Sequence, residues 1–187
     1  MSLRIIAGRH RGRRITTPDG LATRPTSERA REALFGVLER GSPPLRGSRF
    51  LDLFAGSGAA ALEAISRGAS EALCIDQATA AVAAIRANVE ALGERETVAV
   101  LRADACRLGP ASTRFDIAFL DPPYGSGLLA PALASLASGV WLTAGAQIIA
   151  EVATRDRLDA PPGFRLEDER AYGAARLLFL RSDPAAG

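Results

Sequence analysis

The sequence predicts an α/β fold with a mostly parallel, doubly wound sheet. From residue 48 onward, short apolar runs typical of buried strands alternate with segments whose apolar residues recur at helical spacing. Glycines and prolines separate these segments, and acidic residues follow several of the strand-like runs. Strands that alternate with helices form parallel sheets with right-handed crossovers. The carboxyl ends of the strands should therefore meet at one edge.

The first part of the chain predicts a hairpin and a helix. Two β-prone runs are separated by a turn that contains Gly8 and Gly12, so we expect a basic hairpin over residues 1–17. A loop follows, and then residues 27–40 have the apolar spacing of an amphipathic helix. We expect residues 18–47 to connect the hairpin to the alternating region.

The alternating region predicts five strands, three helices and a closing pair of strands. The five strands are expected at residues 49–54, 71–76, 97–104, 115–121 and 146–152. The helices are expected at residues 57–68, 77–93 and 127–138. Residues 164–172 and 175–181 flank Gly173 and predict an antiparallel pair. We expect the whole chain, residues 1–187, to form a single domain.

Composition narrows the class of protein. No run of 18 or more apolar residues occurs, so no membrane span is predicted. The basic N-terminus is not followed by the apolar segment of a signal peptide. Cys74 and Cys106 lie apart, with no clustered histidines. The sequence therefore predicts neither a disulfide framework nor a metal site, and it favours a reducing cytoplasm.

Positive charge is concentrated at the N-terminus. Residues 1–31 hold eight of the 23 basic residues, all of them arginine, against two acidic residues. The rest of the chain carries more acidic than basic residues. Such an asymmetry favours a polyanionic partner that contacts the N-terminal end.

Acidic residues recur where successive strands are expected to end, at Asp52, Asp76, Asp104 and Asp121. Strand ends in an open α/β sheet face the ligand crevice. Asp76 is placed to accept the two hydroxyls of an adenosine ribose. Asp104 is placed to accept an adenine amino group, with a backbone N–H from Ala105 beside it. The edge therefore predicts a ligand that carries adenosine, such as NAD or S-adenosylmethionine.

The loop after the first of these strands contains Gly56 and Gly58. Glycines there permit a tight turn and a close approach of the backbone to a ligand at a helix N-terminus. The pattern also satisfies the dinucleotide fingerprint G-x-G-x-x-G/A, which is a weak signal alone. It is not a Walker A loop, because no Gly-Lys-Ser/Thr follows.

The motif "DPPY", Asp121 to Tyr124, favours S-adenosylmethionine over NAD. The lone pair of a base amino nitrogen is delocalised into the ring, which makes it a poor nucleophile. The carboxylate of Asp121 and the carbonyl of Pro122 can accept its two hydrogens, and proline holds that carbonyl in place because its φ is fixed. Such an effect is positional and electrostatic. Tyr124 can stack on the target base.

Four motifs give the chain a family resemblance. "DLFAGSG" and "DPPY" resemble the class I S-adenosylmethionine methyltransferases that act on exocyclic amino groups of bases. With "RIIAGRHRGRRI" and "TRPTSERAREALF", the chain resembles the RsmD-type family, over roughly residues 3–182. The resemblance implies a Rossmann-like fold with a seven-stranded, mostly parallel sheet, an antiparallel last strand and a small N-terminal hairpin.

The resemblance also implies an activity and a set of partners. It implies methyl transfer from S-adenosylmethionine to the exocyclic N2 of a guanine in 16S rRNA, guanine 966, during assembly of the small subunit. The substrate would be the RNA within an assembling 30S particle, and the enzyme a cytoplasmic monomer that needs no metal.

The resemblance and the motifs together assign three groups of site residues. Catalysis is assigned to Asp121, Pro122 and Tyr124. Cofactor binding is assigned to Asp52, Phe54, Ala55, Gly56, Gly58, Asp76, Asp104 and Ala105. Substrate binding is assigned to Arg4, Arg9, Arg11, Arg13, Arg14, Arg24, Thr26, Pro123 and Tyr124.

Three alternatives remain open on the sequence. The "DPPY" chemistry also fits a DNA or RNA adenine-N6 methyltransferase, although the short chain leaves no room for a DNA target-recognition domain. Gly56, Gly58 and Asp76 also suit a NAD-dependent oxidoreductase, but no hydride-transfer constellation of His, Lys and Tyr is apparent. The basic hairpin alone would suit a non-catalytic RNA-binding protein.

Overall fold

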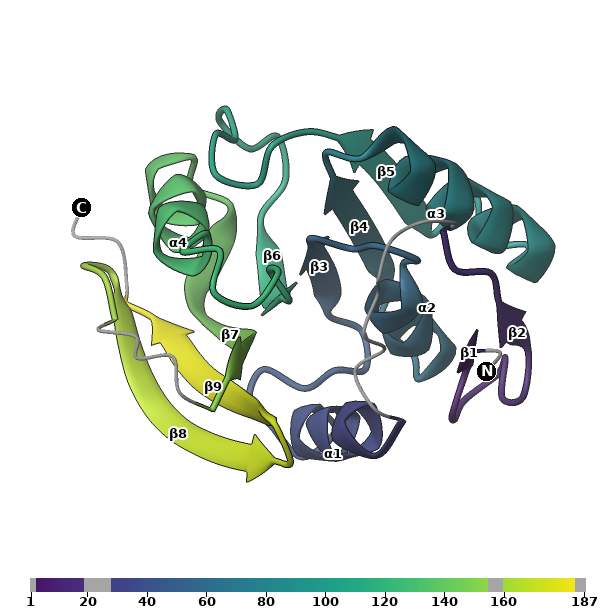
Figure 1. The fold of residues 1–187 in the computed structure, drawn as a ribbon, viewed down its shortest axis with the longest axis horizontal. Helices are drawn as coiled ribbons and strands as arrows, with labels where there is room; N and C mark the ends of the chain where they lie inside the picture. The colour runs from purple at the N-terminus through teal and green to yellow at the C-terminus, as the bar shows by residue number, and fades with distance from the viewer. Residues whose placement is uncertain (1–2, 19–27, 155–159, 184–187) are drawn as a thin grey trace.

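The computed structural model of the protein describes residues 3–18, 28–154 and 160–183, and a seven-stranded sheet lies at its centre (Figure 1). The spatial order of the strands is β5-β4-β3-β6-β7-β9-β8. The strands are β3 (Arg49–Leu53), β4 (Glu71–Asp76), β5 (Val98–Arg102), β6 (Phe115–Leu120), β7 (Leu142–Ala153), β8 (Phe164–Tyr172) and β9 (Ala175–Ser182). β9 is antiparallel to both of its neighbours, whereas β3 to β7 pair in parallel. The predicted sheet, with its antiparallel last strand, is confirmed.

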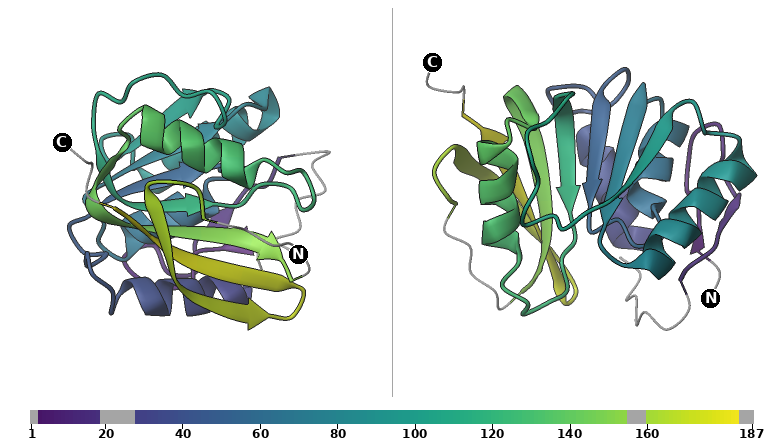
Figure 2. Two further views of the ribbon diagram at one scale, coloured as in Figure 1. Left: turned by 90° about the vertical axis from the view of Figure 1, so that its left-hand side faces the viewer. Right: turned by 90° about the horizontal axis from the view of Figure 1, so that it is seen from above.

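Helices cover both faces of this sheet (Figure 2). They are α1 (Glu28–Leu38), α2 (Ala59–Ser66), α3 (Thr79–Leu92) and α4 (Leu129–Ser138). Apolar side chains of α1, α2 and α3 join one buried cluster, together with Ile5 and Ile15 of the hairpin. Those of α4 join a second cluster on the opposite face. This division follows from the alternation of side chains along each strand.

β7 begins earlier than the sequence predicted. It starts at Leu142, whereas the apolar pattern indicated a start at residue 146. Gly145 has a φ of 71°, and the register with β6 shifts between Phe115 and Ile117. A glycine at a β-bulge interrupts the alternation of apolar residues. The sequence pattern therefore marks only the regular half of the strand.

The N-terminal hairpin is confirmed, but its ladder is short. β1 (Leu3–Arg4) and β2 (Arg14–Ile15) pair over two residues each. The segment between them forms hydrogen bonds within the hairpin and also bonds to α2. The buried carboxylate of Glu63 accepts hydrogen bonds from the backbone N–H groups of Ile6, at 2.7 Å, and Ala7, at 3.0 Å.

A second set of bonds fixes the other end of the hairpin. The side chain of Asn88, on α3, accepts from the Thr16 N–H at 2.8 Å and donates to the Thr16 carbonyl at 2.8 Å. It also donates to the carbonyl of Ser57. The hairpin therefore packs on α2 and α3 as part of the body. Among the residues described above, no helix has both the length and the apolar character needed to cross a membrane.

Candidate active site

A cavity of about 540 Å³ lies at the carboxyl ends of β3, β4, β6 and β7. Neighbouring parallel strands bring their last residues to it. Asp52 is aligned with Cys74 in β4 and with Phe119 in β6, and residues two apart share a face of a strand. Asp76 and Asp121 therefore project from the same face as Asp52. All three acids line the cavity, as the sequence predicted.

The loop between β3 and α2 forms one wall. Phe54, Ala55 and Gly56 line the cavity. Phe54 has a φ of 62°, which is unusual for a residue other than glycine and indicates a tightly constrained turn. Gly56 has a φ of 56°, and a Cβ at this position would have only the Phe54 carbonyl nearby, at 4.0 Å. The backbone at Gly56 is therefore open to a ligand.

Gly58 has a different role from the one its motif suggests. It does not line the cavity. A Cβ on Gly58 would lie 3.2 Å from a methyl carbon of Ile85, on α3. Its φ of 74° also turns the chain into α2. Gly58 therefore supports the site through close packing of the loop on α3.

Asp52 is a buried carboxylate. Only 2% of its surface is exposed, and its Oδ2 accepts a hydrogen bond from the Ala61 N–H at 3.1 Å. Burial raises the pKa of Asp52 from 3.8 to about 7, the Ala61 bond opposes this rise, and the negative charge of Asp76 adds to it. A cation in the cavity would favour the ionised form of Asp52.

Asp76 orders two loops at once. Its Oδ2 accepts from the Gly56 N–H at 2.9 Å, and its Oδ1 accepts from the Ala78 N–H at 2.9 Å. Each carboxylate oxygen has a second lone pair, so Asp76 can still accept a hydrogen bond from a ligand. The predicted ribose contact is compatible with this geometry and stays a prediction.

The structure does not bring Asp104 and Ala105 into this cavity. Asp104 is exposed, its Oδ1 accepts from the Cys106 N–H at 2.9 Å, and its carboxylate lies 4.0 Å from Arg107. Ala105 is buried in the core cluster on the other face of the sheet. The proposed contacts of these two residues with adenine stay predictions that the cavity geometry does not support.

The "DPPY" motif also lines the cavity, through Asp121, Pro122, Pro123 and Tyr124. It follows β6, the neighbour of β3, and the Asp121 N–H donates to the Leu53 carbonyl at 3.4 Å. The Pro123 carbonyl accepts a turn hydrogen bond from the Ser126 N–H at 3.1 Å. Within the described ranges, no donor is bonded to the Pro122 carbonyl. This arrangement leaves the Pro122 carbonyl available, as the sequence argument required.

Glu151 is a site residue that the sequence reasoning missed. It lies on β7, is 4% exposed, and lines the cavity. Its Oε1 accepts a hydrogen bond from the Tyr124 hydroxyl at 2.7 Å. A signal was present, because Glu151 is another acid near the end of an apolar strand. Arg31, on α1, is buried and also lines the cavity.

The chain is similar in sequence to proteins that have a family model and curated names. The family described as Conserved hypothetical protein 95 matches residues 3–181. A relative named "Ribosomal RNA small subunit methyltransferase D", from Escherichia coli (strain K12), is 35% identical over 172 residues, which cover 91% of this chain and 85% of that protein. The chain belongs to this family, the RsmD family. The resemblance predicted from the motifs is confirmed.

A second relative and a solved structure are also similar to this chain. "Putative rRNA methyltransferase YlbH" of Bacillus subtilis (strain 168) is 36% identical over 126 residues, which cover 65% of this chain and 67% of that protein. The solved structure of the putative methyltransferase yhhF from Escherichia coli superposes with a TM-score of 0.82 at 31% identity. It covers 98% of this chain and 99% of that chain. The RsmD-family fold therefore extends over nearly the whole chain.

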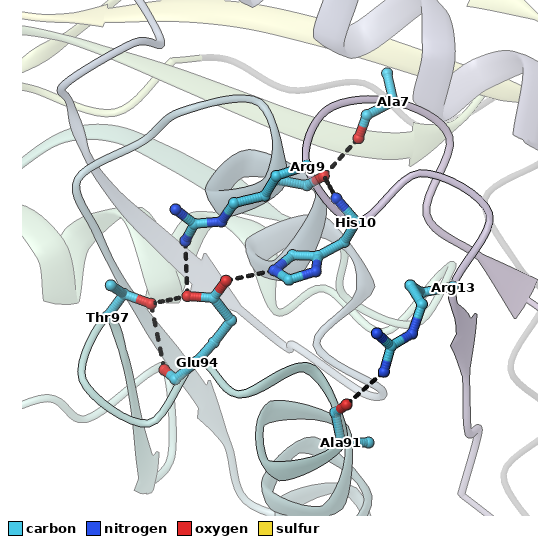
Figure 3. Close-up of polar contacts among 8 residues, drawn as sticks. Ala7, Arg9, His10, Arg13, Ala91, Glu94 and Thr97 are labelled. Atoms are coloured by element: carbon cyan, nitrogen blue, oxygen red, sulfur yellow. Dashed lines mark hydrogen bonds and ion pairs between the residues drawn. The ribbon is translucent and has the colours of Figure 1, made fainter.

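The arginines of the hairpin in this RsmD-family chain fall into two groups. Three of them bond to the protein itself. Arg9 forms an ion pair with Glu94 at 2.7 Å, and Arg13 donates to the Ala91 carbonyl at 2.6 Å (Figure 3). Arg4 donates to the Gly12 carbonyl within the hairpin. The other two, Arg11 and Arg14, are exposed. Within the part of the chain that the structure describes, neither forms a side-chain hydrogen bond or an ion pair.

Glu94 is the centre of the contacts in Figure 3. Its carboxylate pairs with His10 and Arg9 and accepts a hydrogen bond from the Thr97 hydroxyl at 2.5 Å. Burial raises the pKa of Glu94, but the hydrogen bonds with His10 and Thr97 and the charge of Arg9 outweigh it, so the pKa is lowered from 4.5. His10 lies in the turn of the hairpin, and its contact with Glu94 ties this turn to the segment after α3.

Arg24 and Thr26, which were predicted to bind substrate, lie outside the described residues. The remaining substrate residues divide between two places. Pro123 and Tyr124 line the cavity, whereas the hairpin arginines lie on and around α2 and α3.

Proposed function

We propose that this chain transfers a methyl group from S-adenosylmethionine to the exocyclic N2 of a guanine in 16S rRNA, at the guanine 966 position that the family resemblance implies. One observation carries the proposal: the open Gly56 loop and the "DPPY" segment follow neighbouring parallel strands and line a single cavity. A cofactor held by the first segment would lie beside an amino group held by the second.

The described residues fit S-adenosylmethionine. The cavity volume, about 540 Å³, lies in the range typical of small-molecule sites. Gly56 offers backbone without a side chain, and Asp52 and Asp76 offer carboxylates that suit the cationic groups and the ribose hydroxyls. When bound, the cofactor would supply an electrophilic methyl group on a positively charged sulfur.

The protein would prepare the amino group that attacks. The carboxylate of Asp121 accepts one N–H and the carbonyl of Pro122 accepts the other, which directs the nitrogen lone pair toward the methyl group. Preorganised acceptors of this kind lower the barrier without any reorganisation during reaction. Tyr124 provides a face on which the base stacks, and a paired target must first be flipped out of its helix.

The relative named "Ribosomal RNA small subunit methyltransferase D" supports ribosomal RNA as the substrate. The exposed arginines of the hairpin supply the charge that binding to RNA phosphates requires. Arg11 and Arg14 are the better candidates for phosphate contact, because Arg4, Arg9 and Arg13 already bond to the protein.

A transfer assay tests the proposal. The protein is incubated with radiolabelled S-adenosylmethionine and with small ribosomal particles, naked 16S rRNA or duplex DNA, all free of the modification. We expect label in ribosomal RNA. Label in DNA adenine alone would contradict the proposal and favour the adenine-N6 alternative.

Asp121→Ala serves as the matched variant in this assay. We expect it to lower transfer at least 100-fold, a typical loss when an electrostatic catalytic group is removed. Its affinity for S-adenosylmethionine, measured by calorimetry, should stay within about threefold, because the residue acts on the amino group. Calorimetry with NAD is the second arm, and selective binding of NAD would contradict a methyltransferase.

A further inference from the structure

We propose that Glu151 is a positioning residue that holds the ring of Tyr124 in place beside Asp121. The two side chains come from different parts of the chain and meet in the cavity, where the Tyr124 hydroxyl donates to Glu151 Oε1 at 2.7 Å. Hydrogen bonds from a hydroxyl to a carboxylate are shorter and stronger than those between neutral groups. The inference rests on the proposed function, because it concerns how that site holds its target.

Glu151 lies on a rigid element. β7 is a central strand, paired with β6 on one side and with β9 on the other. Glu151 itself is aligned with Leu177 of β9, and its neighbour Ala150 is aligned with Leu120 of β6. A side chain that projects from such a strand has a fixed origin, which is the condition for holding a functional group in place.

Tyr124 has no such support of its own. It lies in a segment outside helices and strands, and Gly125 and Gly127, which follow it, have φ values of 68° and 70°. The tyrosine is only partly buried. A hydrogen bond from its hydroxyl to a strand residue therefore fixes the far end of the ring, while the Asp121-Pro122-Pro123 segment fixes the near end.

Register places Glu151 where it can serve this purpose. Phe119 of β6 is aligned with Ile149 of β7. Asp121 and Glu151 each follow these residues by two positions, so they project from the same face of neighbouring strands. A base that stacks on Tyr124 would then present its amino group to Asp121, and a loose ring would misplace that group.

Glu151 is a buried carboxylate, and such a group is normally kept only where hydrogen bonds compensate for its burial. A carboxylate that is 4% exposed loses most of its hydration, which is costly unless hydrogen bonds replace it. An apolar residue would fill the same place in a strand without this cost. The bond from the Tyr124 hydroxyl is one such hydrogen bond.

A double-mutant cycle measures the coupling. Tyr124→Phe removes the donor and keeps the ring, and Glu151→Leu removes the acceptor with little change in size. We expect each single variant to lower kcat roughly tenfold, the effect of losing one charged hydrogen bond. The double variant should be no slower than the slower single variant. Multiplication of the two losses would overturn the proposal.

Glu151→Gln keeps an acceptor oxygen at the same place, so it should restore most of the kcat that Glu151→Leu loses. The Kd for S-adenosylmethionine should change less than about twofold in every variant. A loss of cofactor affinity that matches the loss of kcat would instead assign Glu151 to cofactor binding. If Glu151→Leu does not fold, Glu151→Ala takes its place in the cycle with Tyr124→Phe, and multiplication of the two losses there would also overturn the proposal.

A spectroscopic arm is independent of activity. The chain has two tyrosines, so fluorotyrosine labelling gives two ¹⁹F signals, and Tyr172→Phe, which should leave kcat unchanged, assigns them. We expect the Tyr124 signal to shift and change width in Glu151→Leu but not in Tyr172→Phe. An unchanged signal would overturn the restraint. A changed signal in a protein that methylates no RNA would leave the restraint standing and contradict the proposed function.

Discussion

At the scale of single residues, the cavity is defined by carboxylates with different surroundings. Asp52 is a buried residue of the cavity lining, and burial raises its pKa to about 7. Asp76 is exposed enough to contact a ligand and is held by two backbone N–H groups. Asp121 lines the same cavity from the end of β6. Strand ends in one sheet thus provide one acid suited to a cation, one to hydroxyls and one to an amino group.

Asp52 predicts a pH-dependent stability. Because its folded-state pKa is raised above the ordinary 3.8, the contribution of Asp52 to stability is present below pH 3.8 and is lost as the pH rises through about 7. Asp52→Asn has no group that ionises at this position, so it does not lose stability in this way as the pH rises. The variant should therefore gain free energy of unfolding relative to the wild type as the pH rises from about 4 to 8.

Urea unfolding of both proteins across that pH range checks the prediction. Cofactor affinity should fall in the same variant, because it loses a carboxylate of the cavity. A difference in unfolding free energy that stays constant with pH would contradict the assignment of Asp52 as the titrating group.

At the scale of elements, the hairpin is the clearest case in which the structure changes the interpretation of the sequence. Its arginines suggested a phosphate clamp, yet the side chains of two of them, Arg9 and Arg13, bond to the body of the protein. Glu63 on α2, Asn88 on α3 and Glu94 beyond α3 hold its backbone and side chains. The exposed Arg11 and Arg14 therefore lie on a hairpin that is bonded to the rest of the fold.

The division of the arginines predicts two different phenotypes. Arg11→Ala with Arg14→Ala should weaken RNA binding and reduce the slope of log K against log salt by roughly two, with little change in unfolding. Arg9→Ala with Arg13→Ala should lower the free energy of unfolding, because it removes bonds to Glu94 and Ala91.

Filter binding at several salt concentrations and thermal unfolding of both double variants check this division. The pairs are matched in charge and lie on the same hairpin. An unchanged salt slope in the Arg11 and Arg14 pair would refute their role as phosphate contacts.

Glu94 predicts that the hairpin loosens in acid. Its folded-state pKa lies below the ordinary 4.5, so the ionised carboxylate stabilises the folded protein above pH 4.5. This contribution is lost as the pH falls through the lowered pKa. Hydrogen exchange of the Ile5 and Gly12 amides, which bond across the hairpin, should accelerate below pH 4.5 relative to amides of β6.

Glu94→Gln is the control for this effect. It should be less stable than the wild type at neutral pH, and the difference between the two proteins should shrink in acid. Equal acid sensitivity of the hairpin in both proteins would assign the effect to another group.

At the scale of the whole molecule, sequence pattern predicted the sheet because strand and helix periods are local properties. β4 and β8 have the bounds that the apolar pattern indicated. The start of β7 was missed because a bulge at Gly145 breaks the alternation. Bulges depend on the neighbouring strand, which a single sequence does not display.

The sequence predicted those residues of the site that lie at the carboxyl ends of parallel strands. Asp52, Asp76 and Asp121 come together because parallel strands end at one edge. Asp104 follows the same rule in sequence but is not among the residues that line the cavity, and its carboxylate accepts a hydrogen bond from the Cys106 N–H of its own loop. Glu151 and Arg31 enter the cavity through packing between distant segments, which local patterns do not encode.

The identity of the methylated atom tests the central claim most directly. Ribosomal RNA from a strain that lacks this protein is incubated with the protein and S-adenosylmethionine, digested to nucleosides and examined by mass spectrometry. We predict a gain of N2-methylguanosine in 16S rRNA with the wild type and none with Asp121→Ala. A gain of N6-methyladenosine, or no methylated nucleoside at all, would contradict the account.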